Sequence, residues 1–310
     1  MMRKLILFAV CFIPAGVLAQ GLSAMYSFTT YSSQQGNYVD INTAIELQGL
    51  EVKNDNAQVE LTTLICEVND TKNVLYLDKR DLNAKKSSEE DKGQMLDIQR
   101  VKLNNGTYLL YMSFKDKNSP AEAVEIKDVI KMDYRENELA VSDVQIIMPP
   151  KKSTSKTLNS KQGYDIIPYP YDISPKEMNR LDYYVEIYNA DKYFAADSLY
   201  FVTAVIEDFS TNRRIETIMR AEKVKAKPVS ALVGALDISE LCEGSYYLTL
   251  EVRDIKNILH AYKRETFFKQ SDKKAALVSD IPQNSFIFAL SDEQLEENIE
   301  SLDPIASEAA

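Results

Sequence analysis

The sequence predicts an all-β protein made of two tandem immunoglobulin-like or fibronectin-like β-sandwiches with a short helical extension at the C-terminus. Apolar and polar side chains alternate along many short stretches, which is the period of a strand that buries one face. Two related stretches also occur in the two halves of the chain, LDIQRVKLNNGTYLLYMSFKD (96–116) and LDISELCEGSYYLTLEVRD (236–254). Such similarity at a distance indicates an internal repeat.

The alternation is clearest near the end of each repeat. Each copy offers about seven strands separated by polar turns, which is typical of an immunoglobulin-like sandwich. Both late strands open with a glycine followed two residues later by a tyrosine, the pattern of a tyrosine corner, in which the hydroxyl bonds to nearby backbone. The predicted inward sets are Tyr108, Leu110, Met112 and Phe114 in the first copy and Tyr246, Leu248, Leu250 and Val252 in the second.

Upstream stretches and turn residues divide the chain into domains. YVDI (38–41) matches YVEI (184–187), which extends the repeat toward the N-terminus. A polar run that begins with two prolines and lacks an apolar period is expected to be a linker. The predicted ranges are 20–148 for the first sandwich, 149–163 for the linker, 164–271 for the second sandwich and 272–310 for the C-terminal extension.

The C-terminal extension contains a predicted helix over about 291–302. Ser291 is a suitable N-cap, with Gln294 three residues later completing a capping box. A narrow apolar stripe follows, and it is a candidate interface for a neighbouring domain or protein. The stripe consists of Leu295, Ile299 and Leu302.

Residues 1–19 are typical of a cleaved secretory signal. Arg3 and Lys4 precede an apolar run that is shorter than the roughly 20 residues of a membrane span. We therefore expect an exported protein that does not span a membrane. The net charge of −11 argues against nucleic acid and against anionic lipid as partners, because both require clustered lysine and arginine.

The sequence offers few groups for catalysis or metal binding. His260 is the single histidine, no nucleophile motif accompanies it, and it is expected to be a partly exposed strand residue. Cys66 and Cys242 fall in different predicted domains, so we expect no disulfide between them and no zinc site. The scattered glycines form no phosphate-binding loop. We predict no catalytic, cofactor-binding or metal-binding residues and a protein that is not an enzyme.

The stretch GYDIIPYPYD (163–172) is the most aromatic part of the chain. Tyr164, Tyr169 and Tyr171 can form a binding patch on a backbone that the prolines hold extended. They can also fill a junction between two domains. The junction is favoured, because aromatic residues between prolines directly after a linker commonly dock that linker.

Residues 163–192 and 236–254, together with FFKQS (267–271), resemble the front part of the GWxTD-domain proteins of Bacteroidota. The resemblance implies export to the periplasm or cell surface of a Gram-negative bacterium. It also implies tandem sandwich modules ahead of a C-terminal domain with a Gly-Trp-x-Thr-Asp motif. This sequence contains no tryptophan, so the naming motif is missing.

The combined observations favour a non-catalytic interaction or scaffold protein of the bacterial envelope that binds a protein partner. One alternative is a carbohydrate-binding module, which the many tyrosines favour and the lack of tryptophan opposes. The other alternative is an accessory region of an enzyme whose active domain lies beyond residue 310.

Overall fold

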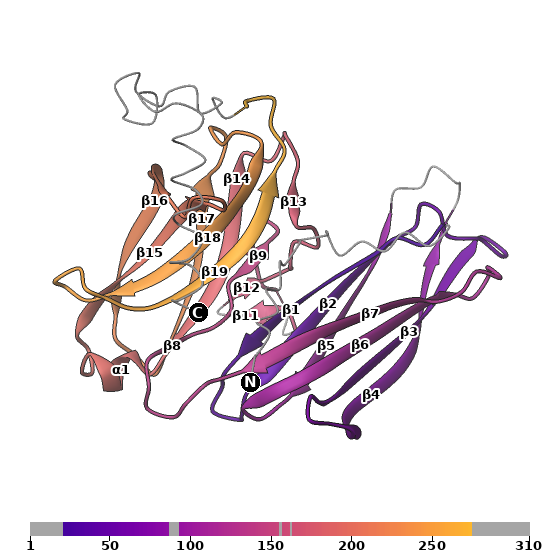
Figure 1. Ribbon diagram of the computed structural model, residues 1–310, viewed down its shortest axis with the longest axis horizontal. Helices are drawn as coiled ribbons and strands as arrows, with labels where there is room; N and C mark the ends of the chain where they lie inside the picture. Colours follow the sequence, from indigo (N-terminus) through magenta and orange to yellow (C-terminus); the bar gives the residue numbers. More distant parts are fainter. Residues whose placement is uncertain (1–20, 87–92, 155–156, 162, 275–310) are drawn as a thin grey trace, which may run out of the picture.

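The computed structural model describes residues 21–86, 93–154, 157–161 and 163–274, which form two β-sandwiches that lie side by side (Figure 1). The predicted fold class is confirmed: the described residues are almost entirely strands, with one short helix, α1 (Ala190–Tyr193). The predicted signal over 1–19 and the predicted C-terminal helix, with Leu295, Ile299 and Leu302, lie outside the described residues.

The first sandwich faces a three-stranded sheet against a four-stranded sheet, and all of its pairings are antiparallel. The three-stranded sheet has the order β1-β2-β5, with bounds Ala24–Tyr31, Tyr38–Glu46 and Gln94–Lys102. The four-stranded sheet has the order β4-β3-β6-β7, with bounds Asp70–Lys85, Asn56–Glu67, Gly106–Asp116 and Val124–Met132.

The second sandwich repeats this arrangement. Its smaller sheet has the order β17-β14-β8, and β9 also pairs with β14; the bounds are Val229–Asp237, Arg180–Tyr188, Ala140–Val141 and Gln145–Ile147. Its larger sheet has the order β13-β19-β18-β15-β16, with bounds Ile173–Ser174, Leu259–Lys269, Gly244–Arg253, Leu199–Asp208 and Arg214–Lys225. Strands β14 to β19 therefore take the places that β2 to β7 take in the first copy.

The predicted boundary at residue 148 is wrong. The strand expected to end the first sandwich pairs instead with β14 of the second, with Val141 opposite Ile187 and Ile147 opposite Asp182. It occupies the place that β1 has beside β2 in the first copy. The alternation of apolar residues predicts a strand, but it carries no information about which sheet the strand joins.

The predicted linker, 149–163, is also more ordered than a polar run suggests. It contains β10 (Lys151–Lys152) and β11 (Ser160–Lys161), which pair with β12 (Tyr164–Asp165) in a small sheet of order β10-β12-β11. Since β9 precedes this segment and β14 follows it, the segment is an excursion between two paired strands of the second sandwich. It lies between the two sandwiches (Figure 1).

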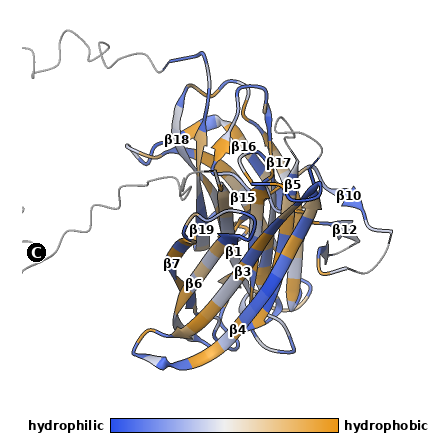
Figure 2. Cartoon of the chain, turned by 90° about the vertical axis from the view of Figure 1, so that its right-hand side faces the viewer, coloured by the Kyte–Doolittle hydropathy of each residue, from blue (hydrophilic) through white to orange (hydrophobic). Residues whose placement is uncertain are grey.

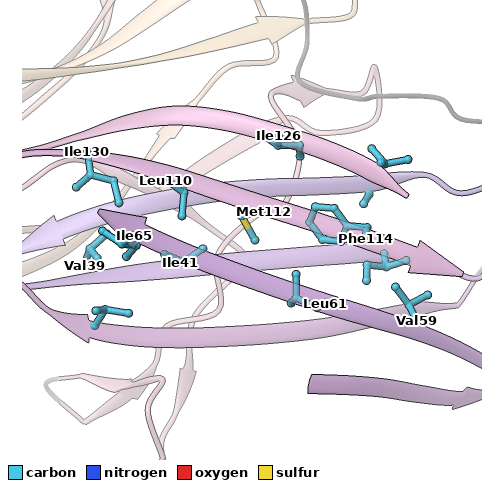
Figure 3. Packing of buried hydrophobic residues seen from close by; sticks show 14 of the residues in the cluster. Val39, Ile41, Val59, Leu61, Ile65, Leu110, Met112, Phe114, Ile126 and Ile130 are labelled. Atoms are coloured by element: carbon cyan, nitrogen blue, oxygen red, sulfur yellow. The ribbon is translucent and has the colours of Figure 1, made fainter. Parts of the chain in front are cut away.

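Each sandwich has its own core of alternating side chains. In the first, apolar residues of both sheets point toward one another, among them Ile41 from β2, Leu61 from β3 and Leu110 from β6 (Figure 3). The edge strand β4 is hydrophilic along much of its length, as Figure 2 shows. Charged side chains on an edge strand discourage pairing with other chains.

Both predicted tyrosine corners are present. Tyr108 donates a hydrogen bond from its hydroxyl to the carbonyl of Asn104 at 2.9 Å, and Tyr246 donates one to the carbonyl of Cys242 at 3.0 Å. A Cβ atom at Gly106 would lie 2.9 Å from the Tyr108 hydroxyl, so glycine leaves room for the ring. The matched geometry in the two copies supports the internal repeat.

Candidate binding site at the junction of the two sandwiches

An aromatic cluster joins the two sandwiches. It consists of Tyr31 from β1, Tyr184 from β14, and Ile147 and Ile166, all of them buried. The rings of Tyr31 and Tyr184 have centroids 6.2 Å apart, and the Tyr31 hydroxyl donates to Oε1 of Gln145 at 3.0 Å. The contact between the sandwiches is therefore a small core in its own right.

The repeated YVDI and YVEI stretches supply acids to both sides of this seam. Asp40 of the first copy binds Arg100, with its Oδ1 2.6 Å from the guanidinium Nε. Glu186 occupies the matching position in the second copy and accepts hydrogen bonds from the hydroxyls of Tyr184 at 2.5 Å and Tyr188 at 2.8 Å. The two equivalent strands, β2 and β14, thus present equivalent acids to the junction.

Lys161, from the excursion, lies between these groups. Its Nζ is 3.1 Å from Oδ2 of Asp40 and 3.4 Å from the centre of the Tyr31 ring, and the side chain is only 8% exposed. Nζ has no well-directed hydrogen bond, so the contact with Asp40 is an ion pair assisted by cation–π contacts. Burial lowers the pKa of Lys161, and the charge of Asp40 opposes that effect.

Asp143, in the turn between β8 and β9, makes a second set of cross-links. Its Oδ2 accepts hydrogen bonds from the backbone N–H and the hydroxyl of Thr30, at 2.9 Å and 2.5 Å. Its Oδ1 is 2.9 Å from Nζ of Lys263. The Tyr134 hydroxyl donates to the carbonyl of Thr30 at 2.7 Å. Hydrogen bonds and an ion pair through Asp143 therefore add to the contact between the two sandwiches.

The three tyrosines singled out in the sequence lie at the margin of this junction. Tyr164 is exposed on β12, and the Tyr169 hydroxyl donates to the carbonyl of Ile173 at 2.9 Å. Tyr171 contacts Glu46 and Gln94 of the first sandwich. The aliphatic Ile166 of the same stretch is what enters the aromatic cluster.

A cleft of about 610 Å³ opens beside the seam between the two sandwiches. Asp128 accepts a hydrogen bond from the Tyr26 hydroxyl at 2.8 Å, and Asp143 binds Thr30 and Lys263. Among the described residues, the carboxylates of Asp172 and Glu265 have no hydrogen-bond or ion-pair partner. The acidic residues that line the cleft are Asp128, Asp133, Asp143, Asp172 and Glu265, and its lysines are Lys131 and Lys263.

The two unpaired carboxyl groups titrate abnormally. Burial, aided by the charges of Asp143 and Asp172, raises the pKa of Glu265 to about 8, and Lys263 opposes the rise. Partial desolvation also raises the pKa of Asp172, although this residue is exposed at the surface. Both groups are therefore held in surroundings that disfavour their negative charge, and a cation entering the cleft would relieve that cost.

An apolar hollow of about 300 Å³ adjoins the cleft and shares Asp172 and Thr266 with it. Its walls come from Ile173 on β13 and from the rings of Phe209 and Phe268. The two hollows thus place acidic groups and an apolar surface next to one another.

The histidine and the two cysteines considered in the sequence lie outside the cleft. His260 on β19 has Nδ1 3.1 Å from the Tyr193 hydroxyl and Nε2 3.2 Å from Oδ2 of Asp254. Cys66 is buried and Cys242 half-buried, and both are free thiols. Within the described ranges no three His, Cys, Asp or Glu residues lie where they could hold a metal ion.

Comparisons with known proteins give only weak similarities. No family model matches the chain, and no curated protein matches it. Similar solved structures include a glycosyl hydrolase family 2 member from Bacteroides cellulosilyticus DSM 14838, with a TM-score of 0.27, 8% identity and coverage of 73% of this chain and 28% of that one. Trypsin-activated alpha-2-macroglobulin from Escherichia coli is also similar, with a TM-score of 0.26, 10% identity and coverage of 85% of this chain and 18% of that one.

This chain thus spans less than a third of either solved chain, and likeness at this level carries no argument about activity. Across the described part of the chain, none of the helices has the length and apolar character needed to cross a bilayer.

Proposed function

We propose that this protein is an exported, non-catalytic interaction module of the bacterial envelope that binds a basic segment of a protein partner in the cleft between its sandwiches. One observation carries the proposal: Asp172 and Glu265 face the cleft without a bonded partner, beside an apolar hollow. A lysine or arginine flanked by an apolar residue matches both features. The GWxTD resemblance supports the envelope location.

The proposal requires a rigid cleft, and the seam supports this requirement. Thr30 of the first sandwich and Lys263 of the second both bind Asp143 at the base of the cleft. A preformed cleft avoids the entropic cost of ordering its walls when the partner binds.

Binding of a synthetic peptide tests the proposal. The probe is a short peptide in which lysine alternates with leucine, and the measurement is isothermal titration calorimetry at low salt. Asp172→Asn combined with Glu265→Gln should weaken binding at least tenfold, because it removes both unpaired carboxylates. Glu216→Gln is the matched control, since Glu216 is exposed on β16 outside the cleft.

Binding should tighten as the pH rises from 6.5 to 8.5, because Glu265 ionises in this range in the free protein. Equal affinity of the double variant and the native chain would overturn the proposal. A glycan array tests the alternative function. Selective glycan binding without peptide binding would favour a carbohydrate-binding module. Against that outcome, Tyr31 and Tyr184 are buried in the seam and form no exposed platform for a sugar ring.

A further inference from the structure

A second hollow, which we call the linker pocket, lies on the outer face of the sheet β1-β2-β5. Its volume is about 350 Å³. One wall comes from the sheet and the other from the excursion that follows β9. The apolar residues of the walls are Met25, Leu96, Ile98, Leu158, Ile167, Pro168 and Pro170.

Asn42 lies among these apolar walls. It alternates on β2 with Asp40 and Ala44, lies opposite Ser27 and Ile98 on the neighbouring strands, and is 7% exposed. Its amide nitrogen, Nδ2, has no hydrogen-bond acceptor among the described residues. A buried donor is nearly always paired in folded proteins. The vacant donor is therefore available to an acceptor from another molecule.

The apolar walls are open to the surface. Leu96 is 58% exposed and Leu158 is 50% exposed, although both border the hollow. An enclosed acyl-chain tunnel would bury such residues. Exposed apolar walls around a concave site are typical of surfaces that another protein covers.

The charges of the lining restrict the ligand further. Asp97 is the one charged residue among the described residues of the lining, and Arg80 binds it at 3.0 Å. A carboxylate or phosphate headgroup would therefore find no cation in the pocket. The acceptor that Asn42 requires is a neutral oxygen, such as a main-chain carbonyl.

We propose that the linker pocket binds a bulky apolar side chain of a partner polypeptide, whose main-chain carbonyl accepts a hydrogen bond from Nδ2 of Asn42. The side chain packs between Leu96 and Ile98 of β5 on one wall and Leu158 and Pro168 on the other. This site borders the acidic cleft only at Tyr26 and Ser27, and it takes a neutral apolar residue where the cleft takes a basic one.

The absence of tryptophan from this sequence makes the proposal easy to test. The probe is N-acetyl-tryptophanamide, which carries a bulky apolar ring and two amide carbonyls. Its fluorescence can be excited selectively in the presence of the full chain. Binding in the pocket should shift its emission to shorter wavelength, because the ring leaves water. N-acetyl-alaninamide should not compete, whereas N-acetyl-leucinamide should.

Three variants locate the effect. Leu96→Ser removes an exposed wall without opening the core, and it should weaken binding about tenfold. Asn42→Ala should weaken binding about fivefold through loss of the hydrogen bond. Leu77→Ser is the matched control, because Leu77 is 64% exposed, close to the 58% of Leu96, but lies on β4 outside the pocket. Circular dichroism confirms that each variant is folded.

The outcomes are decisive. No shift with the native chain, or equal shifts with the native chain and Leu96→Ser, would overturn the proposal. Competition by methyl decanoate but not by N-acetyl-leucinamide would identify a lipid site and reject the peptide assignment. The double variant Asp172→Asn with Glu265→Gln should leave probe binding unchanged, which separates this site from the cleft.

Discussion

At the residue scale, Tyr108 and Tyr246 show the repeat most directly. Each is buried in its own core, and each hydroxyl donates to the carbonyl of the residue four positions earlier. The hydrogen bond fastens the loop before β6 or β18 to the strand that follows it. Equal contacts at matched positions imply equal contributions to the stability of the two copies.

We expect Tyr108→Phe and Tyr246→Phe each to lower the free energy of unfolding by about 1 kcal/mol, because each substitution removes one hydrogen bond and keeps the ring. Urea denaturation followed by circular dichroism measures the change. Tyr262→Phe is the control and should have little effect, since Tyr262 is exposed on β19. A cost in only one of the two copies would show that the corners are not equivalent.

Glu265 gives the protein a specific pH dependence. Its pKa is about 8 in the folded chain and near 4.3 in an unfolded chain, so the folded state holds its proton more tightly. Its contribution to stability is therefore complete below about pH 4 and is lost as the pH rises to 8. Between pH 5 and pH 8 the native chain should lose stability relative to Glu265→Gln.

Urea denaturation at pH 5, 6.5 and 8 measures that difference. Glu216→Gln should run parallel to the native chain over the whole range, because its side chain is exposed. Parallel curves for Glu265→Gln as well would show that Glu265 is solvated normally and would weaken the case for the acidic cleft.

At the scale of elements, the first strand of the second sandwich decides where that domain begins. β8 and β9 cover one edge of β14, and the excursion that holds Lys161 follows them. Alternating apolar residues predicted one strand over 139–148, and the structure has two short strands there, β8 and β9. Their partner was predicted wrongly, because the two prolines after Met148 look like the end of a domain whereas they begin an internal excursion.

A pair of fragments tests the corrected boundary. Residues 137–274 contain β8 and β9 and should unfold cooperatively. Residues 164–274 leave the edge of β14 unpaired and its outward apolar residues uncovered, so this fragment should aggregate or unfold at lower temperature. Differential scanning calorimetry compares the two. Identical melting temperatures would restore the boundary first predicted from the sequence.

At the scale of the whole molecule, the seam joins the two sandwiches through apolar and polar contacts. The aromatic cluster around Tyr31 and Tyr184 supplies apolar contact, while Asp143 and Lys161 supply charged contacts across it. A junction of this kind contrasts with the flexible connection that a polar linker would predict. Both proposed binding sites depend on it, because each has walls from more than one part of the chain.

We expect the two sandwiches to show the same rotational correlation time in ¹⁵N relaxation measurements. Tyr184→Ala should separate the values, because it removes the ring that contacts Tyr31 and approaches Lys161. Tyr262→Ala, on an exposed face, is the control. Two distinct correlation times in the native chain would show that the sandwiches move independently.

The sequence by itself determined the fold class, the repeat and the two tyrosine corners. All of these depend on local periodicity, since side chains that alternate along a strand can bury their apolar face only against a second sheet. The sequence also favoured a junction for the stretch around Tyr169.

Tertiary structure alone decided the pairing of β8 and β9, the burial of Lys161 and the two hollows proposed as binding sites. Lys161 lies in a polar run, and nothing in its neighbours signals that Asp40 and Tyr31, more than a hundred residues earlier, surround it. The same holds for Asn42 and for Glu265, whose surroundings come from segments distant in the chain. Periodicity specifies the faces of single strands, whereas a site between domains depends on how those faces meet.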